Sequence, residues 1–382
     1  MSKIKVMTVF GTRPEAIKMA PVVQELKKRN TEFEGVTVVT AQHREMLDQV
    51  LEIFKIVPDY DLNVMKQRQS LDQITSSVIL NLGSIIEDEK PDIVLVHGDT
   101  TTTFAASISA FYHQTAIGHV EAGLRTWDKY SPFPEEMNRQ MTDVLADIYF
   151  APTSQSEDNL LNENHPGNSI FVTGNTAIDA LKETVHKDYH HAVMDVINPT
   201  QRMILVTMHR RENQGEPMRR VFQAMREVVE KYDDVEIVYP VHLNPVVQEA
   251  AKDILGNHNR IHLIDPLDVV NFHNLAARSY FIMTDSGGVQ EEAPSLGKPV
   301  LVLRDTTERP EGVDAGTLRL VGTDPKVVKE WMSKLLSDSS EYQRMAEAKN
   351  PYGDGKASQR ILDAIAYQLG NSGKEVERFK LK

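Results

Sequence analysis

The chain has 382 residues, of which 41% are hydrophobic and 25% charged, which is typical of a globular protein with two domains of ordinary size. It contains no cysteine, which excludes disulfides, thiolate metal sites and cysteine nucleophiles. The formal net charge of −13 argues against nucleic acid as a partner, because a phosphate backbone requires a basic surface.

Targeting signals are not expected from this sequence. Its apolar runs fall well short of the roughly 20 residues that a membrane-spanning helix needs. The N-terminal segment reaches a charged turn too soon for a secretory signal. We therefore expect a cytoplasmic protein without a membrane partner.

Short apolar segments rich in β-branched residues recur along the chain. Most lack alternation with polar residues, which indicates strands buried on both faces of a parallel sheet. Helical patterns lie between them, for example over 16–29 and 218–231, and this alternation is typical of βαβ units. The predicted strands are 5–10, 36–39, 93–96, 116–120, 148–150 and 170–172, followed by 203–206, 235–239, 261–264, 280–283, 300–303 and 318–321.

These patterns predict an α/β fold with two Rossmann-like, doubly wound parallel-sheet domains that face each other across a cleft. We place the N-terminal domain at 1–174 and the C-terminal domain at 175–354. Residues 179–202, which include a histidine pair and an Asn-Pro step, are predicted to be irregular and to connect the halves. Residues 359–369 are predicted to be helical, and the charged tail 374–382 is expected to fray.

The first predicted strand ends in Gly11-Thr12-Arg13-Pro14-Glu15. A turn with Pro14 at the start of a helix explains the glycine and the proline. Arg13 and Lys18 then lie near the positive end of that helix, where cations are disfavoured, and a bound anion would remove the conflict. We therefore predict phosphate binding here.

The second domain opens in a similar way, with His209-Arg210-Arg211-Glu212 after its first strand. The arginines offer forked donors to a phosphate or a carboxylate. In the simpler alternative the histidine is structural and Glu212 neutralises an arginine.

The stretch Ser286-Gly287-Gly288 follows another apolar strand. Without side chains, its backbone N–H groups can approach a phosphate, and Glu292 can accept from sugar hydroxyls. The simpler alternative is a helix that begins with Ser286 as N-cap. The sequence has neither GxGxxG nor GxxxxGK[ST], so we expect a nucleotide diphosphate as substrate rather than NAD as cofactor.

Three carboxylates lie near strand ends of the first half: Asp99, Glu121 and Glu135. Each has a structural alternative, as a helix cap for Asp99, a partner of Arg125 for Glu121, and a partner of Arg139 for Glu135. Together they are predicted to lie at one sheet edge, which suits general acid/base chemistry.

A divalent metal held with His97 or His119 is the alternative use of these acids. The sequence contains no HExxH or close bis-aspartate motif to support it. We therefore expect no metal cofactor.

Taken in order, the motifs from Phe10 to Gly355 resemble the non-hydrolysing UDP-N-acetylglucosamine 2-epimerases of bacterial cell-envelope synthesis. Each motif alone is a weak signal, whereas the ordered set is specific. One variation is Met208 before His209, where many members have glycine. The matching stretches are FGTRPEAIKMAP, TAQHREML, HGDTTTT, GHVEAGLRT, PFPEEMNR, TGNTAIDAL, HRREN, YPVHLNP, TDSGGVQEEAPSLGKPVLVLRDTTERPE and NPYGDG.

The resemblance implies a fold like that of GT-B glycosyltransferases, with a C-terminal helix, about 355–382, packed back on the first domain. It also implies interconversion of UDP-GlcNAc and UDP-ManNAc, usually in a homodimer, for envelope polymers such as teichoic acid or capsule. The C2 proton is not next to a carbonyl and NAD is not expected, so the implied route eliminates UDP and re-adds it to a 2-acetamidoglucal.

By motif, the resemblance implies roles for many residues of this chain. The uracil is expected at 267–272, and a second UDP-GlcNAc activates some bacterial members. The implied catalytic residues are Asp99, Glu121, Glu135 and His209, and the implied substrate-binding residues are Arg13, Lys18, Arg139, Leu267, Phe272, Ser286, Gly287, Gly288, Glu292 and Arg309. Gln42, Gln69, Glu136, Arg210 and His242 lie in the motifs associated with the activator.

Three other functions fit parts of the pattern. A GT-B glycosyltransferase uses the same kind of nucleotide site but needs an acceptor, and a hydrolysing epimerase releases UDP and free ManNAc. A non-catalytic UDP-sugar sensor would have no use for three clustered acids.

Overall fold

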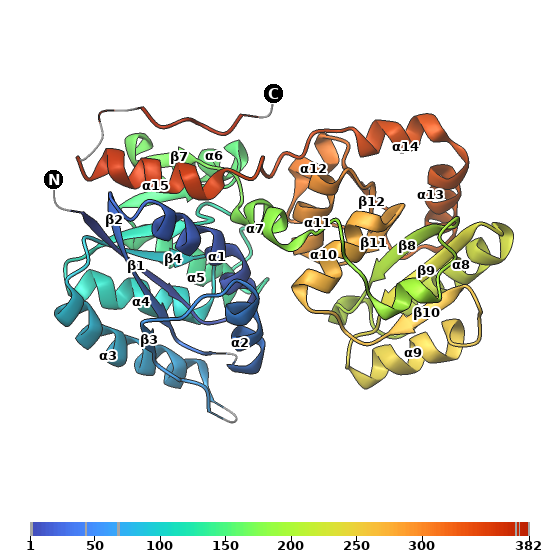
Figure 1. Cartoon of the computed structure of the whole chain (residues 1–382), viewed down its shortest axis with the longest axis horizontal. Helices are drawn as coiled ribbons and strands as arrows, with labels where there is room; N and C mark the ends of the chain where they lie inside the picture. The colour runs from blue at the N-terminus through green and yellow to red at the C-terminus, as the bar shows by residue number, and fades with distance from the viewer. Residues whose placement is uncertain (1–2, 43, 67–68, 371–372, 374, 381–382) are drawn as a thin grey trace. The chain divides into compact units, whose positions relative to one another are not determined.

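The computed structural model describes residues 3–42, 44–66, 69–370, 373 and 375–380 (Figure 1). The chain forms two compact units, one up to Ala180 together with Tyr352–Lys380, and the other Leu181–Pro351. Each unit is built on a parallel sheet, which confirms the predicted pair of Rossmann-like domains. The boundaries lie a few residues from 174 and 354, because helix α7 (Thr176–Thr184) runs across the first one.

The sheet of the N-terminal unit has the strand order β3-β2-β1-β4-β5-β6-β7, with β1 and β4 adjacent where the winding reverses. All six strands predicted for this half are present. The two-residue strand β3 was not predicted, because so short a segment has no periodicity. The strands are β1 (Ile4–Phe10), β2 (Phe33–Val39), β3 (Tyr60–Asp61), β4 (Ile93–His97), β5 (Ala116–Val120), β6 (Ile148–Ala151) and β7 (Ile170–Val172).

Helices of the N-terminal unit connect these strands. The first of them begins with a capping box. Thr12 is the N-cap, and its backbone N–H donates to the Glu15 side chain. The turn after β1 is therefore fixed by its own sequence. Besides α7, these helices are α1 (Arg13–Lys28), α2 (Arg44–Ile53), α3 (Leu71–Glu89), α4 (Thr101–Tyr112), α5 (Glu135–Leu145), α6 (Ser154–Asn162) and α15 (Ala357–Gln368), with a 3-10 turn, η1 (Gly167–Ser169).

The end of the chain belongs to the N-terminal unit. Helix α15 lies beside α1 (Figure 1), and an ion pair of 2.7 Å joins Arg29 Nη1 to Asp363 Oδ1. The expectation that the tail frays is wrong for residues 375–380. The Phe379 N–H donates to the Val172 carbonyl at 2.8 Å and the ring is buried. Lys374 and residues 381–382 lie outside the described residues, as does His43 of the TAQHREML motif.

The sheet of the C-terminal unit has the order β10-β9-β8-β11-β12-β13, and all six strands predicted for this half are present. Its strands are β8 (Arg202–Thr207), β9 (Val235–Pro240), β10 (Ile261–Ile264), β11 (Phe281–Thr284), β12 (Val300–Val302) and β13 (Leu318–Leu320). Its helices are α8 (Glu216–Lys231), α9 (Pro245–Leu255), α10 (Val269–Arg278), α11 (Gly287–Glu292), α12 (Pro310–Asp314), α13 (Pro325–Ser337) and α14 (Ser339–Ala346), with 3-10 turns η2 (Ala192–Asp195), η3 (Arg211–Asn213) and η4 (Ala293–Leu296).

The segment 179–202 is less irregular than predicted. Its first residues complete α7, and the short turn η2 follows the histidine pair. Asp179 of α7 contacts a distant part of the chain. Its carboxylate accepts from the N–H groups of Ala357 and Ser358 at the start of α15. This long-range contact leaves no local sequence pattern.

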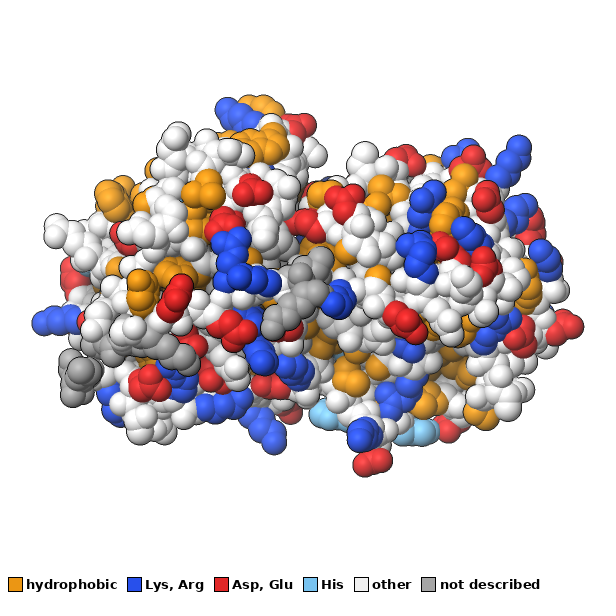
Figure 2. Space-filling model, turned by 90° about the horizontal axis from the view of Figure 1, so that it is seen from above, with side chains coloured by type: hydrophobic (Ala, Val, Ile, Leu, Met, Phe, Trp, Pro, Cys, Tyr) orange, Lys and Arg blue, Asp and Glu red, His pale blue; other side chains and the backbone are white. Residues whose placement is uncertain are grey.

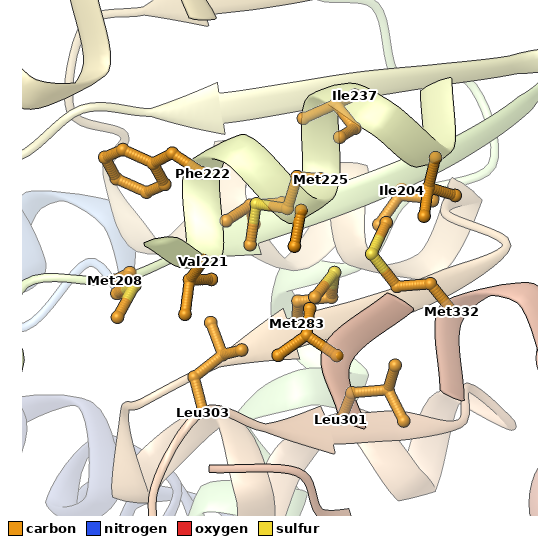
Figure 3. Packing of buried hydrophobic residues seen from close by; sticks show 14 of the residues in the cluster. Ile204, Met208, Val221, Phe222, Met225, Ile237, Met283, Leu301, Leu303 and Met332 are labelled. Carbon is orange, nitrogen blue, oxygen red and sulfur yellow. The ribbon is translucent and has the colours of Figure 1, made fainter. Parts of the chain in front are cut away.

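The core of the C-terminal unit contains several methionines. Figure 3 shows Met225 of α8 and Met332 of α13 packed with Met283 of the sheet. Met208, where the resembling family often has glycine, is buried in the same cluster. The variation therefore affects packing, as expected, since the Met208 backbone still accepts from Tyr239 Oη at 2.6 Å.

The surface carries charges of both signs. On the face that Figure 2 presents, lysine and arginine side chains are interspersed with aspartate and glutamate. Within the described ranges, no helix is both long and apolar enough to cross a membrane.

Candidate functional site

Glu15 joins two of the loops at the carboxyl edge of the N-terminal sheet. One carboxylate oxygen accepts from the Gly11 and Thr12 N–H groups at 3.0 and 2.7 Å, and the other from the hydroxyls of Thr100 and Thr103 at 2.6 and 3.1 Å. Burial raises the pKa of Glu15, and hydrogen bonds from Thr100, Thr12 and Gly11 oppose that shift. The loops after β1 and β4 are thereby held together.

Glu121 lies directly after β5 with a positive φ of 67°, a strained conformation for a non-glycine residue. Its Oε2 atom forms an ion pair with Lys18 and accepts from Asn175 Nδ2 at 2.8 Å. The side chains of Lys18 and Glu121 are only 12% and 9% exposed, so water screens this pair weakly. Lys18, which the sequence predicted to bind an anion, therefore pairs with Glu121, one of the three candidate acids.

His97 lies beside the same carboxylate, with its Nε2 atom 3.7 Å from Glu121 Oε2. Both ring nitrogens are buried without a hydrogen-bond partner among the described residues. Burial lowers the pKa of His97 to about 4, although Glu121 opposes the shift. The imidazole is therefore neutral at pH 7.

Asp99 lies in the loop between β4 and α4, next to the Glu121 side chain. A Cβ placed at Gly98 would come within 3.8 Å of Glu121 Oε1, so the two candidate acids flank the same short loop. Asp99 Oδ2 accepts from Arg139 Nη2 at 2.5 Å, and the Asp99 carbonyl accepts from Asn138 Nδ2 at 3.0 Å. The helix cap is Thr100 rather than Asp99.

Two acids begin helix α5. Glu135, the third candidate acid, is half-buried and lies one turn before Arg139. Glu136 is fully buried and accepts from the N–H groups of Thr126 and Trp127 at 3.0 and 3.1 Å. Arg139 pairs with Glu136 at 3.3 Å and with Asp99, whereas the sequence alternative paired it with Glu135.

The alternative partner of Glu121 is also wrong. Arg125 donates to Asp143 Oδ2 and Glu163 Oε2, each at 2.6 Å. Burial alone would lower the pKa of Arg125, but these two carboxylates raise it above its ordinary value.

Asp285 organises the loop after β8 in the C-terminal unit. It is fully buried and accepts from the N–H groups of His209 and Arg210 at 3.0 and 2.9 Å and from Asn213 Nδ2 at 3.0 Å. The His209 ring stacks on His242 with centroids 5.4 Å apart. Burial lowers the pKa of His209, and Asp285 opposes the shift, so this ring is neutral near pH 7.

The two glycines after Ser286 differ in their surroundings. A Cβ at Gly287 would lie 2.5 Å from Arg309 Nη1, whereas one at Gly288 would have only Glu292 Oε1 within 4 Å, at 3.9 Å. The Arg309 Nε atom donates to Glu291 at 2.7 Å. Gly287 therefore makes room for an arginine, and Gly288 leaves its side of the backbone open. Ser286 is the N-cap of α11, as the simpler alternative held, without a side-chain cap hydrogen bond.

The predicted ribose and uracil residues lie around α10. Glu292 Oε2 is 3.2 Å from His273 Nε2. Leu267 lines a cavity of about 940 Å³ along β10, together with Asp268 and Asn271. Phe272 is half-buried and packs against the hydrophobic core.

The residues predicted for the activator are dispersed over both units. Gln42 accepts from Thr102 Oγ1 at 2.9 Å, and Gln69 accepts from the Lys66 N–H at 3.1 Å. Arg210 lies 3.7 Å from Glu308. His242, stacked on His209, also accepts from the Asn244 N–H at 3.1 Å.

Other pairings bear on the alternatives considered from sequence. Glu212 does neutralise an arginine, Arg304, at 3.0 Å. In the part of the chain that the structure describes, no three His, Asp or Glu side chains are grouped so as to hold a metal ion.

Several residues of the site were not singled out from sequence: Asn175, Asn138, Asp285 and Glu291. Each lies inside a quoted motif or directly beside a predicted residue. Asn175 is in TGNTAIDAL and Asp285 opens DSGG, so the motifs carried the signal. Their roles depend on contacts 54 and 75 residues away, with Glu121 and Arg210.

Comparison with known proteins identifies the family of this chain. The UDP-N-acetylglucosamine 2-epimerase family model matches residues 24–366. The UDP-N-acetylglucosamine 2-epimerase of Bacillus subtilis (strain 168) is 62% identical over 379 residues, which cover 99% of each chain. The Neisseria meningitidis UDP-GlcNAc 2-epimerase structure, bound to UDP-GlcNAc, is 51% identical with a TM-score of 0.87 and covers 95% of this chain and 100% of that one.

A more distant structure shows the fold alone. The glycotransferase of kitacinnamycin is 10% identical, with a TM-score of 0.65, and covers 97% of this chain and 100% of its own. Because the family match spans most of the chain and close relatives align over their full length, the chain belongs to the UDP-N-acetylglucosamine 2-epimerase family and is an enzyme of its non-hydrolysing isomerase type.

Proposed function

We propose that this enzyme interconverts UDP-GlcNAc and UDP-ManNAc by elimination and re-addition of UDP. The observation that carries the proposal is the pair of candidate acids on one loop edge, Glu121 with Lys18 and Asp99 with Arg139. Carboxylates gathered at one sheet edge suit general acid/base catalysis. The close relatives named as 2-epimerases support the same reaction.

In the proposed first half-reaction, one carboxylate removes the proton on C2. The electron pair of the C2–H bond forms the C1–C2 double bond, and the C1–O bond breaks with its electrons moving to UDP. In the second half, a proton is added to C2 from the opposite face and a UDP oxygen attacks C1. Asp99, Glu121 and Glu135 are the proposed acids and bases.

The departing diphosphate needs positive donors, because its negative charge grows as the C1–O bond breaks. We assign this role to Arg13, Lys18 and Arg309, with His209 as a neutral donor. Asp285 holds the His209 loop by its backbone, and Glu291 holds Arg309.

The remaining groups of the C-terminal unit are proposed to bind the rest of the nucleotide. Ser286, Gly287 and Gly288 would contact phosphate, Glu292 the ribose, and the stretch from Leu267 to Phe272 the uracil.

We propose that the reaction needs neither NAD nor a metal. The elimination route moves a proton and a leaving group without a net redox change, so it requires no hydride carrier. We also propose a cytoplasmic homodimer that supplies ManNAc units for envelope polysaccharide. Activation by a second UDP-GlcNAc would involve Gln42, Gln69, Glu136, Arg210 and His242.

The test is proton NMR of the purified enzyme with UDP-GlcNAc in D2O, without added metal or NAD. We expect UDP-ManNAc to appear with deuterium at C2. Accumulation of UDP and free ManNAc would identify the hydrolysing reaction instead. Substrate binding without turnover would favour a glycosyltransferase or a sensor. Asp99→Asn distinguishes a sensor from an epimerase, since a sensor should keep its function and an epimerase should not.

A further inference from the structure

His119 is a fully buried histidine with acceptors on both sides of its ring. It lies on β5, two residues before Glu121. Its Nδ1 atom is 2.6 Å from Asp143 Oδ1, and its Nε2 atom is 2.7 Å from the Gly98 carbonyl oxygen. The side chains of His119 and Asp143 are both 0% exposed.

These contacts fix where the ring hydrogens lie. A carbonyl oxygen only accepts, so Nε2 must carry a hydrogen. On the other side, Asp143 Oδ2 accepts from Arg125 Nη2 at 2.6 Å and from the Gly123 N–H at 3.3 Å, which favours an ionised carboxylate. Burial would raise the pKa of Asp143, but His119 and Arg125 hold it below its ordinary value. Nδ1 must therefore donate as well.

The charges around the ring favour a cationic His119. Asp143 is fully buried and contacts His119 and Arg125. Arg125 is shared with Glu163, whose side chain is 24% exposed, so a neutral His119 would leave the buried Asp143 with only a shared cation. Other titratable groups near this cluster are His97 from β4, Tyr149 from β6, and His165, which lies 3.4 Å from Glu163.

The group that His119 holds is the turn before Asp99. Gly98 has a φ of +68°, which favours glycine, and its N–H donates to the Val120 carbonyl at 2.9 Å. The hydrogen bond from His119 fixes the Gly98 carbonyl on the other side. Since Asp99 follows at once and Asn138 holds its carbonyl, the direction of the Asp99 side chain depends on this contact.

We propose that His119 is a protonated imidazolium that positions Asp99 through the Gly98 carbonyl. It touches no substrate in this role and is a positioning residue. The simpler alternative is a neutral core histidine that only fills space. The effect on turnover rests on the proposed epimerase function, whereas the protonation state does not.

The protonation state is tested by neutron diffraction from crystals of the unmodified protein in D2O. We expect deuterium on both ring nitrogens of His119, since both face acceptors. His97 serves as the internal control, since burial lowers its pKa to about 4 and it should not be doubly protonated. Deuterium on only one nitrogen of His119 would overturn the proposal.

The positioning role is tested with His119→Gln in the C2 exchange assay. Because a small displacement of a reacting group can cost about 10²-fold, we expect kcat to fall by about that factor with little change in KM. The acid limb of the pH profile should move to higher pH, because loss of a cation disfavours ionisation of nearby carboxylates. The exposed His190, paired with Asp195, provides the matched control His190→Gln, with unchanged kinetics.

The outcomes separate the two hypotheses. If the unmodified enzyme shows no epimerisation, the proposed function fails, and the neutron result still decides the charge of His119. If His119→Gln lowers kcat only in proportion to the folded fraction, with an unmoved pH profile, the positioning role is overturned.

Discussion

At Glu121, one carboxylate oxygen is shared between a lysine and an amide. This arrangement keeps a buried acid charged in a strained backbone conformation. Strain and burial at one residue are features of functional sites, because a purely structural residue would be free to relax. His97 adds an unsatisfied imidazole at 3.7 Å.

Glu121→Gln should abolish most of the activity. Loss of a general acid or base typically costs 10²–10⁴-fold, and we expect kcat in the C2 exchange assay to fall by about that much. UDP binding, measured by calorimetry, should persist. The exposed Glu52 provides the control Glu52→Gln. A Glu121→Gln enzyme with normal turnover would remove Glu121 from the mechanism.

The same pair predicts a stability effect. Lys18→Met leaves a buried carboxylate without its cation, which should cost about 3–5 kcal/mol of unfolding free energy. The double variant Lys18→Met with Glu121→Gln should regain much of that loss, since no charge then remains unpaired. Additive losses in a denaturant titration would contradict the coupling.

Glu308 predicts a pH dependence in the C-terminal unit. Burial would raise its pKa, but hydrogen bonds from Arg304 lower it to about 2. A lowered pKa gives stability that is present above the ordinary value of about 4.5 and is lost as the pH falls toward about 2.

Glu308→Gln should therefore cost on the order of 1–2 kcal/mol at pH 7, allowing for solvent screening, and much less near pH 2. Denaturant titrations at the two pH values measure the difference. The exposed Glu330 provides the control Glu330→Gln, which should show no such pH dependence. An equal cost at both pH values would mean that the ion pair contributes nothing.

At the scale of elements, the short helix α11 combines two glycines that serve different purposes. Gly287 is buried against the Arg309 guanidinium, which Glu291 holds in place, while the added Cβ at Gly288 would meet almost nothing. The sequence pattern suggested one purpose for both, close approach of a phosphate. The difference between the two glycines comes from the loop after β12, which places Arg309 against Gly287 and not against Gly288.

Gly287→Ala should destabilise the ligand-free protein by about 1–3 kcal/mol, because the new methyl group displaces Arg309 from Glu291. Gly288→Ala is the matched control on the same helix, and its stability should be unchanged or slightly higher. If phosphate approaches the backbone at Gly288, this control should still bind UDP more weakly. Equal stability losses in thermal unfolding would contradict the distinction.

At the scale of the whole molecule, the chain ends in the unit where it began. Asp179, which precedes the point where the chain enters the C-terminal unit, accepts a hydrogen bond from the first turn of α15. The segment after α15 adds Phe379 to the N-terminal core. The N-terminal unit is therefore assembled from two stretches of the chain that are far apart in sequence.

Phe379→Ala should cost about 3–5 kcal/mol in the unfolding of the N-terminal unit, as expected for a buried phenylalanine. Hydrogen exchange followed by mass spectrometry would locate the loss in β7 and α15, with the C-terminal unit unaffected. Phe111→Ala is the matched control, since that ring is 56% exposed. Equal protection in both variants would show that the tail adds no stability.

By itself the sequence determined two parallel sheets, twelve of the thirteen strands found among the described residues, and the motifs that identify the family. These features follow from local periodicity and composition, because short apolar runs predict the buried strands of a parallel sheet. Tertiary structure alone decided the partners: Lys18 and Asn175 on Glu121, Arg139 on Asp99, Asp179 on α15, and Phe379 in the core. Most of these contacts join residues 40 to nearly 200 positions apart, where no local pattern specifies which charge meets which. The physical reason is that charge pairing depends on distance in space, and only the folded chain sets that distance.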